Sequence, residues 1–377
     1  MDDRERGAWI AFNRAPGVGV VRFRRLLERF GSLAEAWGAP RSALAEAGLD
    51  RRALDGVTQL QGTLGLESEV QRVRDAGARA VTWQDPDYPR LLKEIADPPP
   101  VLYVKGALLP ADDQAVAMVG TRRATVYGRD VAERLARDLT AAGMTVVSGL
   151  AKGIDTHAHR GALAADGRTI AVLGHGIDTL YPYENRRLAE EILQSGALVT
   201  DYALGTGPLA ENFPPRNRII SGLSAGVVVV EADHTSGALI TSKFALDQGR
   251  EVFAVPGPIT SPASRGCNRL IQDGAKLVTA AEDVLVELNP HLLRLPSAPA
   301  AAAQLPLTLG AASDGGDGAI HPLIAALREM GGPAHVDQLA RALGVPVAEV
   351  SGGLALLELE GRVRHAGGMR YALALAP

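Results

Sequence analysis

Short apolar segments alternate with segments of helical period along the middle of the chain. Between Val116 and Gly257, runs of Val, Ile, Leu and Ala each stop at a glycine or a small polar residue, and a segment with helical spacing follows. Continuous apolar strands separated by amphipathic helices are typical of a parallel sheet that helices cover on both faces. The pattern therefore predicts an open, doubly wound α/β domain.

The segments that precede this domain have different patterns. Residues 1–78 carry apolar residues at helical spacing, broken by Gly, Pro or Ser, and predict a small helical domain. RAVTW and VLYVK flank a proline-rich connection and predict two strands that extend the sheet, because clustered prolines exclude a central strand or a long helix between them. We therefore expect the α/β domain over residues 79–288.

Two further regions follow the α/β domain. Residues 289–318 are rich in Pro, Ala, Gly and Ser without any period, which predicts a flexible linker. Residues 319–377 contain three segments of helical period and then RVRHAGGMRYAL, which is typical of a β-hairpin. Three helices followed by a hairpin predict a winged-helix domain at this end of the chain.

The third helix of this winged-helix pattern would be the recognition helix, and it is acidic. Its charged residues are Glu349, Glu358 and Glu360. Because phosphate binding requires cations, we expect a protein-contact or structural role for this domain. Duplex binding through Arg362, Arg364 and Arg370 is the alternative.

The loops that follow the predicted strands are rich in groups that bind anions. These loops collect along one edge of a doubly wound sheet, where ligands bind. Glycines let a backbone approach a ligand closely, and helix N-termini offer free N–H groups to an anion. The candidates for phosphate binding at this edge are Gly120, Thr121, Arg122, Arg123, Ser148, Gly149, Lys152, Ser236, Gly237 and Lys243.

A second group of candidates lies at a helix start within FPPRNRIISG. It consists of Phe213, Arg216, Asn217 and Arg218. An aromatic ring beside arginines is suited to base stacking and phosphate pairing, which hold single-stranded nucleic acid without reading its sequence. The alternatives are structural: Phe213 in the core, its neighbouring arginines in salt bridges, and Arg122 capping a strand or pairing with Glu231.

Several classes of function are disfavoured by what the motifs lack. The first predicted strand does not end in G-x-G-x-x-G, so NAD or FAD binding is not expected. G-x-S-x-G does not occur around Ser148 or Ser236, and Glu231 and Asp233 are the only acids placed for general acid–base chemistry. The edge is therefore expected to hold an anion rather than to cut one.

A metal site is not expected either. His157 and His159 are two residues apart on a predicted helix for which Asp155 or Thr156 is the expected N-cap. At that spacing the two histidines point to different faces, and no third ligand follows at useful spacing. We expect one histidine to be packed and the other to lie near the edge of the sheet, with no cofactor.

Composition adds limits to these expectations. The net charge is −4 and the sequence pI is about 6.1, so nucleic-acid binding requires a local basic patch. Cys267 is the only cysteine, which excludes a disulfide framework and a Cys-rich zinc site. The chain opens with charged residues and holds no apolar run of the ~18 residues a membrane helix needs. We expect a cytoplasmic protein.

The ordered motifs VGTRRATVYG, SGLAKGIDTHAHRGAL, AVLGHGIDTLYP, FPPRNRIISGLS, VVVVEADHTSGALITSKFAL and SRGCNRLIQDGA resemble those of the DNA-processing family called DprA or Smf. The resemblance implies an extended Rossmann-like domain that binds single-stranded DNA, with duplex DNA as a weaker ligand. It implies a non-enzymatic recombination mediator that protects incoming strands in natural transformation. The implied partners are a RecA-type recombinase, single-strand-binding protein, which it displaces, and a second copy of the chain.

The resemblance also implies a DNA pocket. The family's pocket corresponds here to Gly120, Thr121 and Arg122, to Ser148, Gly149 and Lys152, and to Phe213, Arg216, Asn217 and Arg218. Some members carry a basic residue three positions before the loop phenylalanine, where this chain has Ala210. That contact is not expected here.

Two other functions are weighed against this one. A nucleotide phosphoribohydrolase-like enzyme on a Rossmann-like fold would resemble the pattern P-G-G-x-G-T-x-x-E, which is absent from the chain. A nucleotide-sensing regulator with a winged helix would need specific duplex binding, which the acidic third helix disfavours.

The helical N-terminal domain has two interpretations. Its turn Pro16–Gly19 precedes a helix with Arg22, Arg24, Arg25 and Arg29, which resembles a helix-hairpin-helix (or SAM-like) element able to hold a phosphate backbone. The alternative is a compact bundle with a solvated basic face.

Overall fold

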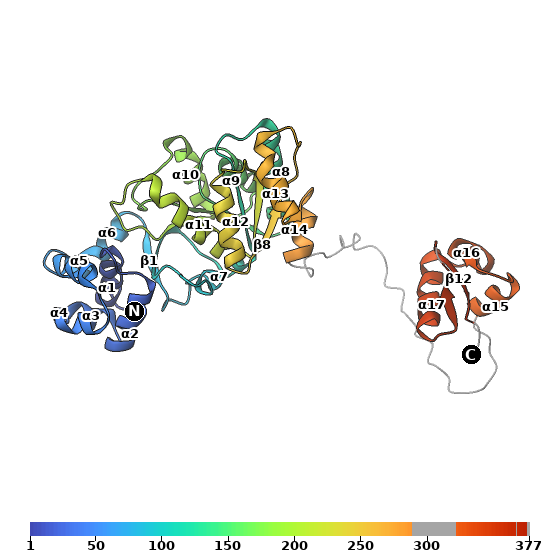
Figure 1. Cartoon of the computed structure of the whole chain (residues 1–377), viewed down its shortest axis with the longest axis horizontal. Coiled ribbons are helices and arrows are strands. Elements are labelled where there is room, and N and C mark those ends of the chain that lie inside the picture. Colours follow the sequence, from blue (N-terminus) through green and yellow to red (C-terminus); the bar gives the residue numbers. More distant parts are fainter. Residues whose placement is uncertain (289–321, 367, 375–377) are drawn as a thin grey trace. The chain divides into compact units, whose positions relative to one another are not determined.

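The computed structural model describes residues 1–288, 322–366 and 368–374. The chain divides into two units, Met1–Ser297 and Ala298–Pro377, each with a hydrophobic core of its own (Figure 1). The linker expected over residues 289–318 lies outside the described residues. The boundaries expected after residues 78 and 288 stay predictions.

The first unit is built on one large sheet, which has nine strands within the described residues. The strand order is β1-β2-β6-β5-β4-β3-β7-β8-β9. The strands are β1 (Arg79–Thr82), β2 (Val101–Gly106), β3 (Ala115–Gly120), β4 (Thr145–Ser148), β5 (Thr169–Val172), β6 (Ala197–Thr200), β7 (Gly226–Glu231), β8 (Glu251–Ala254) and β9 (Lys276–Leu277). Because β3 pairs with β4 on one side and β7 on the other, the sheet winds in both directions from β3.

Strands β3 to β9 are parallel, whereas β2 pairs antiparallel with β6 and β1 pairs antiparallel with β2. The prediction of an extended, doubly wound Rossmann-like sheet is confirmed. So is the prediction that the two strands before the main domain extend it. The sheet is mixed rather than purely parallel. The proline-rich connection between β1 and β2 contains no long crossover helix, so β2 runs back beside β1 in the antiparallel direction.

Helices cover both faces of the sheet. They are α7 (Arg90–Lys93), α8 (Val126–Ala141), α9 (Ile154–Ala164), α10 (Arg186–Ser195), α11 (Phe213–Gly222), α12 (Ala238–Asp247), α13 (Arg265–Gln272) and α14 (Ala281–Leu288). Ala115, Ala117 and Val119 of β3 pack with α11 and α12, whereas Val116 and Met118 pack under α8 and α9. Alternate residues of one strand therefore enter opposite cores, and both alternating sets are apolar. Figure 1 shows α11 and α12 side by side.

The N-terminal residues are helical, as expected. The helices are α1 (Asp3–Arg14), α2 (Val20–Phe30), α3 (Leu33–Gly38), α4 (Arg41–Glu46), α5 (Arg51–Gln61) and α6 (Leu66–Asp75). Their core, centred on Trp9, Phe12 and Phe23, is continuous with Tyr103 of β2 and Leu198 of β6. These helices therefore pack directly on one face of the sheet.

The second unit contains α15 (Pro322–Glu329), β10 (Ala334–His335), α16 (Val336–Leu343), α17 (Val347–Leu359), β11 (Val363–His365) and β12 (Arg370–Leu373). The three helices and the β11–β12 hairpin confirm the winged-helix pattern, and the short strand β10 completes a sheet of order β10-β12-β11. The glutamates Glu349, Glu358 and Glu360 are exposed, as expected from the sequence. Among the described residues, no helix is both long enough and apolar enough to span a membrane.

Candidate nucleic-acid interface

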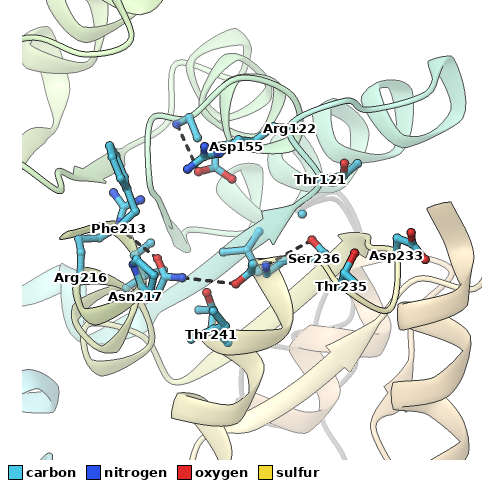
Figure 2. A pocket seen from close by; sticks show the side chains of 18 of the residues that line it. Thr121, Arg122, Asp155, Phe213, Arg216, Asn217, Asp233, Thr235, Ser236 and Thr241 are labelled. Carbon is cyan, nitrogen blue, oxygen red and sulfur yellow. Dashed lines mark hydrogen bonds between the residues drawn. The ribbon is translucent and has the colours of Figure 1, made fainter. Parts of the chain in front are cut away.

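A cavity of about 630 Å³ lies at the carboxyl edge of the parallel strands, where β3 meets β4 and β7. Its walls are the loop after β3, the start of α9, the start of α11, and the loop between β7 and α12 (Figure 2). Nine of the residues expected at the site line it. They are Gly120, Thr121, Arg122, Arg123, Phe213, Arg216, Asn217, Ser236 and Gly237.

Two close backbone contacts hold the walls together. Gly153 has φ +81°, and a Cβ at this position would lie 2.2 Å from the carbonyl oxygen of Thr121. Only glycine fits there, and it lets the β4–α9 loop press against the β3–α8 loop. On the other side, the Glu231 carboxylate accepts hydrogen bonds from the Thr125 N–H at 2.9 Å and from its hydroxyl at 2.7 Å. Glu231 therefore braces the loop and does not pair with Arg122.

Arg216 is the buried cation of the cavity, with 4% of its surface exposed. Its Nη1 donates to the carbonyl oxygens of Gly149, at 3.0 Å, and of Val172. Burial lowers the pKa of Arg216 to about 10, which the nearby carboxylate of Asp155 opposes. The guanidinium is therefore charged at neutral pH and is fixed in place by the main chain.

Asp155 is the buried counter-charge to Arg216. Its Oδ2 accepts from the N–H groups of Gly149, at 3.1 Å, and Ala151, at 3.3 Å. Burial raises the pKa of Asp155, and Arg216 acts against that rise. Asp155 or Thr156 was expected as the N-cap of α9, but the helix begins at Ile154 with Gly153 as its N-cap, so this expectation is wrong. The carboxylate turns back to the β4–α9 loop instead.

Phe213 begins α11 and is half-buried at the cavity wall. The guanidinium carbon of Arg122 lies 5.3 Å from the centroid of the Phe213 ring, and that of Arg216 lies 5.7 Å from it. Both distances are within the range of cation–π contacts. The Tyr181 ring follows at 5.9 Å between centroids, with a tilt of 51°. One aromatic ring is thus surrounded by two cations and a second ring.

The start of α12 forms the opposite wall. Ser236 accepts a hydrogen bond from the Ala238 N–H at 3.3 Å, and Gly237 accepts one from the Asn217 side chain at 3.4 Å, which ties α12 to α11. The side chain of Thr241, one turn into the helix, also faces the cavity (Figure 2). A helix N-terminus offers partial positive charge to an anion.

Five expected residues do not line the cavity. Ser148 is buried and donates to the Met118 carbonyl at 2.6 Å, so it holds β4 to β3. Gly149 lies behind the wall, where a Cβ would come within 3 Å of both Arg216 and Asp155. The others are Lys152, Arg218 and Lys243.

These three cations have separate environments. Lys152 is exposed and pairs with Glu184 at 2.5 Å. Arg218 pairs with Asp201 at 2.6 Å and also reaches Asp97, so the salt-bridge alternative holds for this residue. Lys243 is exposed on α12 outside the lining of the cavity. The two arginines of α11 that were expected at the site therefore have different roles: Arg216 lines the cavity, whereas Arg218 forms a salt bridge with Asp201.

The histidines in α9 are also placed. His159 is fully buried and its Nδ1 lies 2.7 Å from the Thr169 hydroxyl, whereas the half-buried His157 lies 2.6 Å from Glu133. Burial lowers the pKa of His159 to about 3. Among the described residues, no group of three His, Cys, Asp or Glu side chains is placed to hold a metal ion.

Some lining residues had not been expected at the site. They are Ala151, Asp155, Pro214, Ile220, Asp233, Thr235, Ala238, Ile240 and Thr241. Ala210, at the position where some members of the resembled family carry a basic residue, also lines the cavity. Asp233 adds a negative charge, and its Oδ1 accepts a hydrogen bond from the His234 N–H at 2.7 Å and lies 2.6 Å from the His234 Nδ1. Thr241 lies one helical turn after Gly237, and that spacing was the available signal for it, whereas Thr235 lies in the loop before α12.

An exposed pair of arginines, a buried fixed arginine, a half-buried ring and a helix N-terminus meet in this cavity, and these groups are chemically suited to a phosphate with an attached aromatic group. The fold defines a Rossmann-like α/β protein with a winged-helix unit. Comparisons with known proteins identify the family.

The family model "DNA recombination-mediator protein A" matches residues 79–289, more than half of the chain. The models "DprA-like N-terminal HHH domain" and "DprA winged helix domain" match residues 3–55 and 296–369. The protein Smf of Synechocystis is 35% identical over 98% of this chain and 99% of its own length. The chain therefore belongs to the DprA/Smf family of recombination mediators, which are DNA-binding proteins rather than enzymes.

Solved structures agree with this assignment. The chain resembles DprA of Streptococcus pneumoniae with a TM-score of 0.66 and 37% identity, over 75% of this chain and 98% of that one. It resembles DprA of Helicobacter pylori with a TM-score of 0.50 and 30% identity, over 55% of this chain and 95% of that one. The latter structure is described as showing a single-stranded DNA binding mode. The expected family and fold are confirmed.

Proposed function

We propose that the cavity between α11 and α12 is where this recombination mediator binds single-stranded DNA. The observation that supports this most directly is the stacking of Arg122 on Phe213, because it places a phosphate-binding group and a base-binding ring side by side. Single strands are held by just this combination of backbone cations and aromatic platforms. The single-stranded DNA binding mode described for the Helicobacter pylori relative adds support.

Each wall has its own task in this proposal. Arg122 and Arg123 are exposed, and within the described residues neither forms an ion pair, so both are free to bind phosphates. The fork of a guanidinium suits a phosphodiester. The α12 N-terminus receives a second phosphate oxygen, and Arg216 supplies fixed positive potential from behind the ring. Phe213 stacks one base.

Duplex DNA fits this arrangement less well. The Phe213 ring is half-buried in the wall of a recess, so a base must leave its partner and its stack to reach it. Unstacking a paired base costs a few kcal/mol, whereas a single strand is already open. We therefore expect the protein to prefer single strands and to bind duplex more weakly.

Membership of the recombination-mediator family supports the wider role. A protein that covers single strands protects them, displaces single-strand-binding protein, and delivers them to a RecA-type recombinase during natural transformation. The acidic, exposed third helix of the winged-helix unit suits a protein contact better than a phosphate backbone.

A homodimer completes the proposal. Strand β9 ends the sheet with Leu277 43% exposed, and Val286 on α14 and Leu246 on α12 are 44% and 63% exposed. An open sheet edge beside exposed apolar side chains is a surface that another copy of the chain covers readily. The dimer is tested by the mass of the protein in solution.

The first experiment is equilibrium binding of the full chain to a labelled dT oligonucleotide and to a duplex of equal length, across a range of salt concentrations. Arg122→Ala should weaken binding to all sequences and flatten the log–log salt slope by about 0.7, the contribution of one phosphate contact on a single strand. Arg134→Ala is the matched control, because Arg134 is 72% exposed, lies on α8 outside the cavity and pairs only with Asp138.

The outcomes separate clearly. Tighter single-strand binding that depends on Arg122 but not on Arg134 supports the cavity as the DNA site. Wild-type protein that fails to bind dT at low salt would remove the proposal. An unchanged slope in a folded Arg122→Ala protein would exclude Arg122 from the site.

A further inference from the structure

Two exposed tyrosines lie beside the cavity on the segment that leads from β5 to α10. Tyr181 is 44% exposed and Tyr183 is 73% exposed. Large exposed rings are unusual on a chain in which only 4% of residues are aromatic. Tyr181 and Tyr183, here called the tyrosine pair, do not line the cavity itself. Their position therefore needs a separate explanation.

The tyrosine pair continues the cavity along the edge of the sheet. β5 lies next to β4 on the side away from β7, so the loop after β5 is the next one beyond the β4–α9 loop. The Tyr181 ring lies 5.9 Å from Phe213 between centroids. The order along the edge is thus Arg122, Phe213, Tyr181, in which a cation and two rings follow one another.

The segment is anchored firmly to the site. Asn185, the last residue of the short 3-10 turn Tyr183–Asn185, donates from Nδ2 to the Leu150 carbonyl at 2.8 Å and to the Thr156 hydroxyl at 2.9 Å. Tyr183 is therefore held close to the β4–α9 loop, which leads into the helix that carries Asp155. A ring on an anchored segment loses little conformational entropy when a ligand stacks on it.

Cations surround the tyrosine pair. Lys152, Arg186 and Arg187 are exposed, and each pairs with a neighbouring glutamate at the surface. The pKa of Arg186 is raised by its hydrogen bond to Glu190 and further by its contact with Tyr183. Exposed ion pairs of this kind contribute little stability. Their cations can therefore exchange a carboxylate for a phosphate without unfolding the surface.

We propose that Tyr181 and Tyr183 form a second base-binding subsite for single-stranded DNA, which takes the bases next to the nucleotide held at Phe213, with Lys152 and Arg186 beside the connecting phosphates. The inference rests on the proposed function of the cavity. It extends the interface from β3, β4 and β7 to β5. The interleaving of rings and cations, continuous with the cavity, favours a nucleic-acid strand over a protein partner for these side chains.

Oligonucleotide length tests the subsite. Wild type, Tyr183→Ala, Tyr181→Ala and Tyr183→Phe are titrated with dT oligonucleotides of roughly 4 to 16 nucleotides, the span of single-strand sites. The shortest strands fill only the cavity, so Tyr183→Ala should bind them like wild type. Longer strands should bind wild type more tightly but Tyr183→Ala about five- to tenfold more weakly than wild type, the effect of one exposed base–ring stack. Tyr183→Phe keeps the ring and should match wild type.

Tyr127 provides a control on the other side of the cavity. Tyr127 on α8 is 45% exposed, and its hydroxyl donates to the Pro256 carbonyl at 2.8 Å, on the β8 side. Tyr127→Ala, which removes this ring, should bind strands of every length like wild type. A 5-iodo-deoxyuridine placed beyond the first bound nucleotide should photo-crosslink to the peptide that contains Tyr181 and Tyr183.

Equal affinity of wild type and both alanine variants at every length, with Arg122→Ala still impaired, would overturn the subsite and leave the cavity intact. Crosslinks confined to the peptide that contains Tyr127 would overturn it too. Wild type that binds no dT strand at all would instead overturn the proposed function on which the subsite rests.

Discussion

Asp155 and Arg216 form a buried charge pair at the back of the cavity, and separating the two charges should be costly. Asp155 is 7% exposed and Arg216 is 4% exposed. Asp155→Ala removes the acceptor of the Gly149 and Ala151 N–H groups and leaves Arg216 without its nearest carboxylate. Arg216→Met leaves the Asp155 carboxylate buried without a cation.

The expected magnitude follows from these contacts. Asp155 and Arg216 interact through space without a direct ion pair, so removing one of them should cost less than the roughly 3–5 kcal/mol of breaking a direct buried pair, although an uncompensated charge still remains out of water. Total stabilities are about 5–15 kcal/mol, so each single variant should lose a large share. The double variant Asp155→Ala/Arg216→Met buries no net charge. We expect it to be more stable than the sum of the single losses implies, with an interaction free energy of about 1–3 kcal/mol.

Urea unfolding of the full chain, followed by far-ultraviolet circular dichroism, measures all four proteins at neutral pH. Circular dichroism suits the question because it reports on the helices themselves, whereas the tryptophans, Trp9, Trp37 and Trp83, all lie in the first 83 residues of the sequence. Single losses that add to the double loss within about 0.5 kcal/mol would show that the two charges are independent and refute the reasoning.

Three further variants test other parts of the structure. His159 is held neutral by burial, which lowers its pKa to about 3, so the unfolded chain binds a proton at this residue below pH 6.5 whereas the folded chain does not. Wild type should therefore lose about 1.4 kcal/mol of unfolding free energy per pH unit from pH 6.5 down towards 3, relative to His159→Gln. Parallel curves of unfolding free energy against pH for the two proteins would contradict this. Gly153→Ala should cost about 1–3 kcal/mol in unfolding free energy and weaken DNA binding, because its Cβ meets Thr121, whereas Gly205→Ala, also at positive φ but with open space around it, should leave binding unchanged. Phe213→Ala should cost about 1–3 kcal/mol of single-strand binding, measured by titration with dT, and a loss no larger than that of Arg134→Ala would return the ring to a packing role.

Much of the fold could be predicted because the strands of a doubly wound sheet are continuous apolar runs. Residues 116 and 118 of β3 enter one core while residues 115, 117 and 119 enter the other, so every one of these positions is apolar. The strand can therefore be recognised from the sequence without knowing which residues face which side. The strand order and the antiparallel joining of β2 to β6 could not be predicted. They depend on which distant edge the chain returns to, and no local pattern encodes that choice.

The site could be predicted in outline but not in its internal roles. The loop glycines and arginines were found because strands end where ligands bind. Arg216 and Arg218 were treated alike, although residues two apart on a helix face different directions; Arg216 enters the cavity and Arg218 pairs with Asp201. The role of Asp155 was missed because the start of a helix can be predicted only to within a residue or two. A shift of that size decides whether the Asp155 carboxylate caps the helix or lies near Arg216 as its counter-charge.

The continuous core beneath the N-terminal helices has a consequence for how the chain loses its structure. Trp9 and Phe23 pack in the same cluster as Tyr103 and Leu198 of the sheet, and the Asn13 side chain of α1 donates to the Asp201 carbonyl at 3.0 Å. Cutting the chain between α6 and β1 would expose apolar surface on both fragments. Such surfaces associate, so each fragment should aggregate when expressed alone. The N-terminal helices and the sheet are therefore expected to melt as one cooperative unit rather than as two modules that evolution or a protease could separate cleanly.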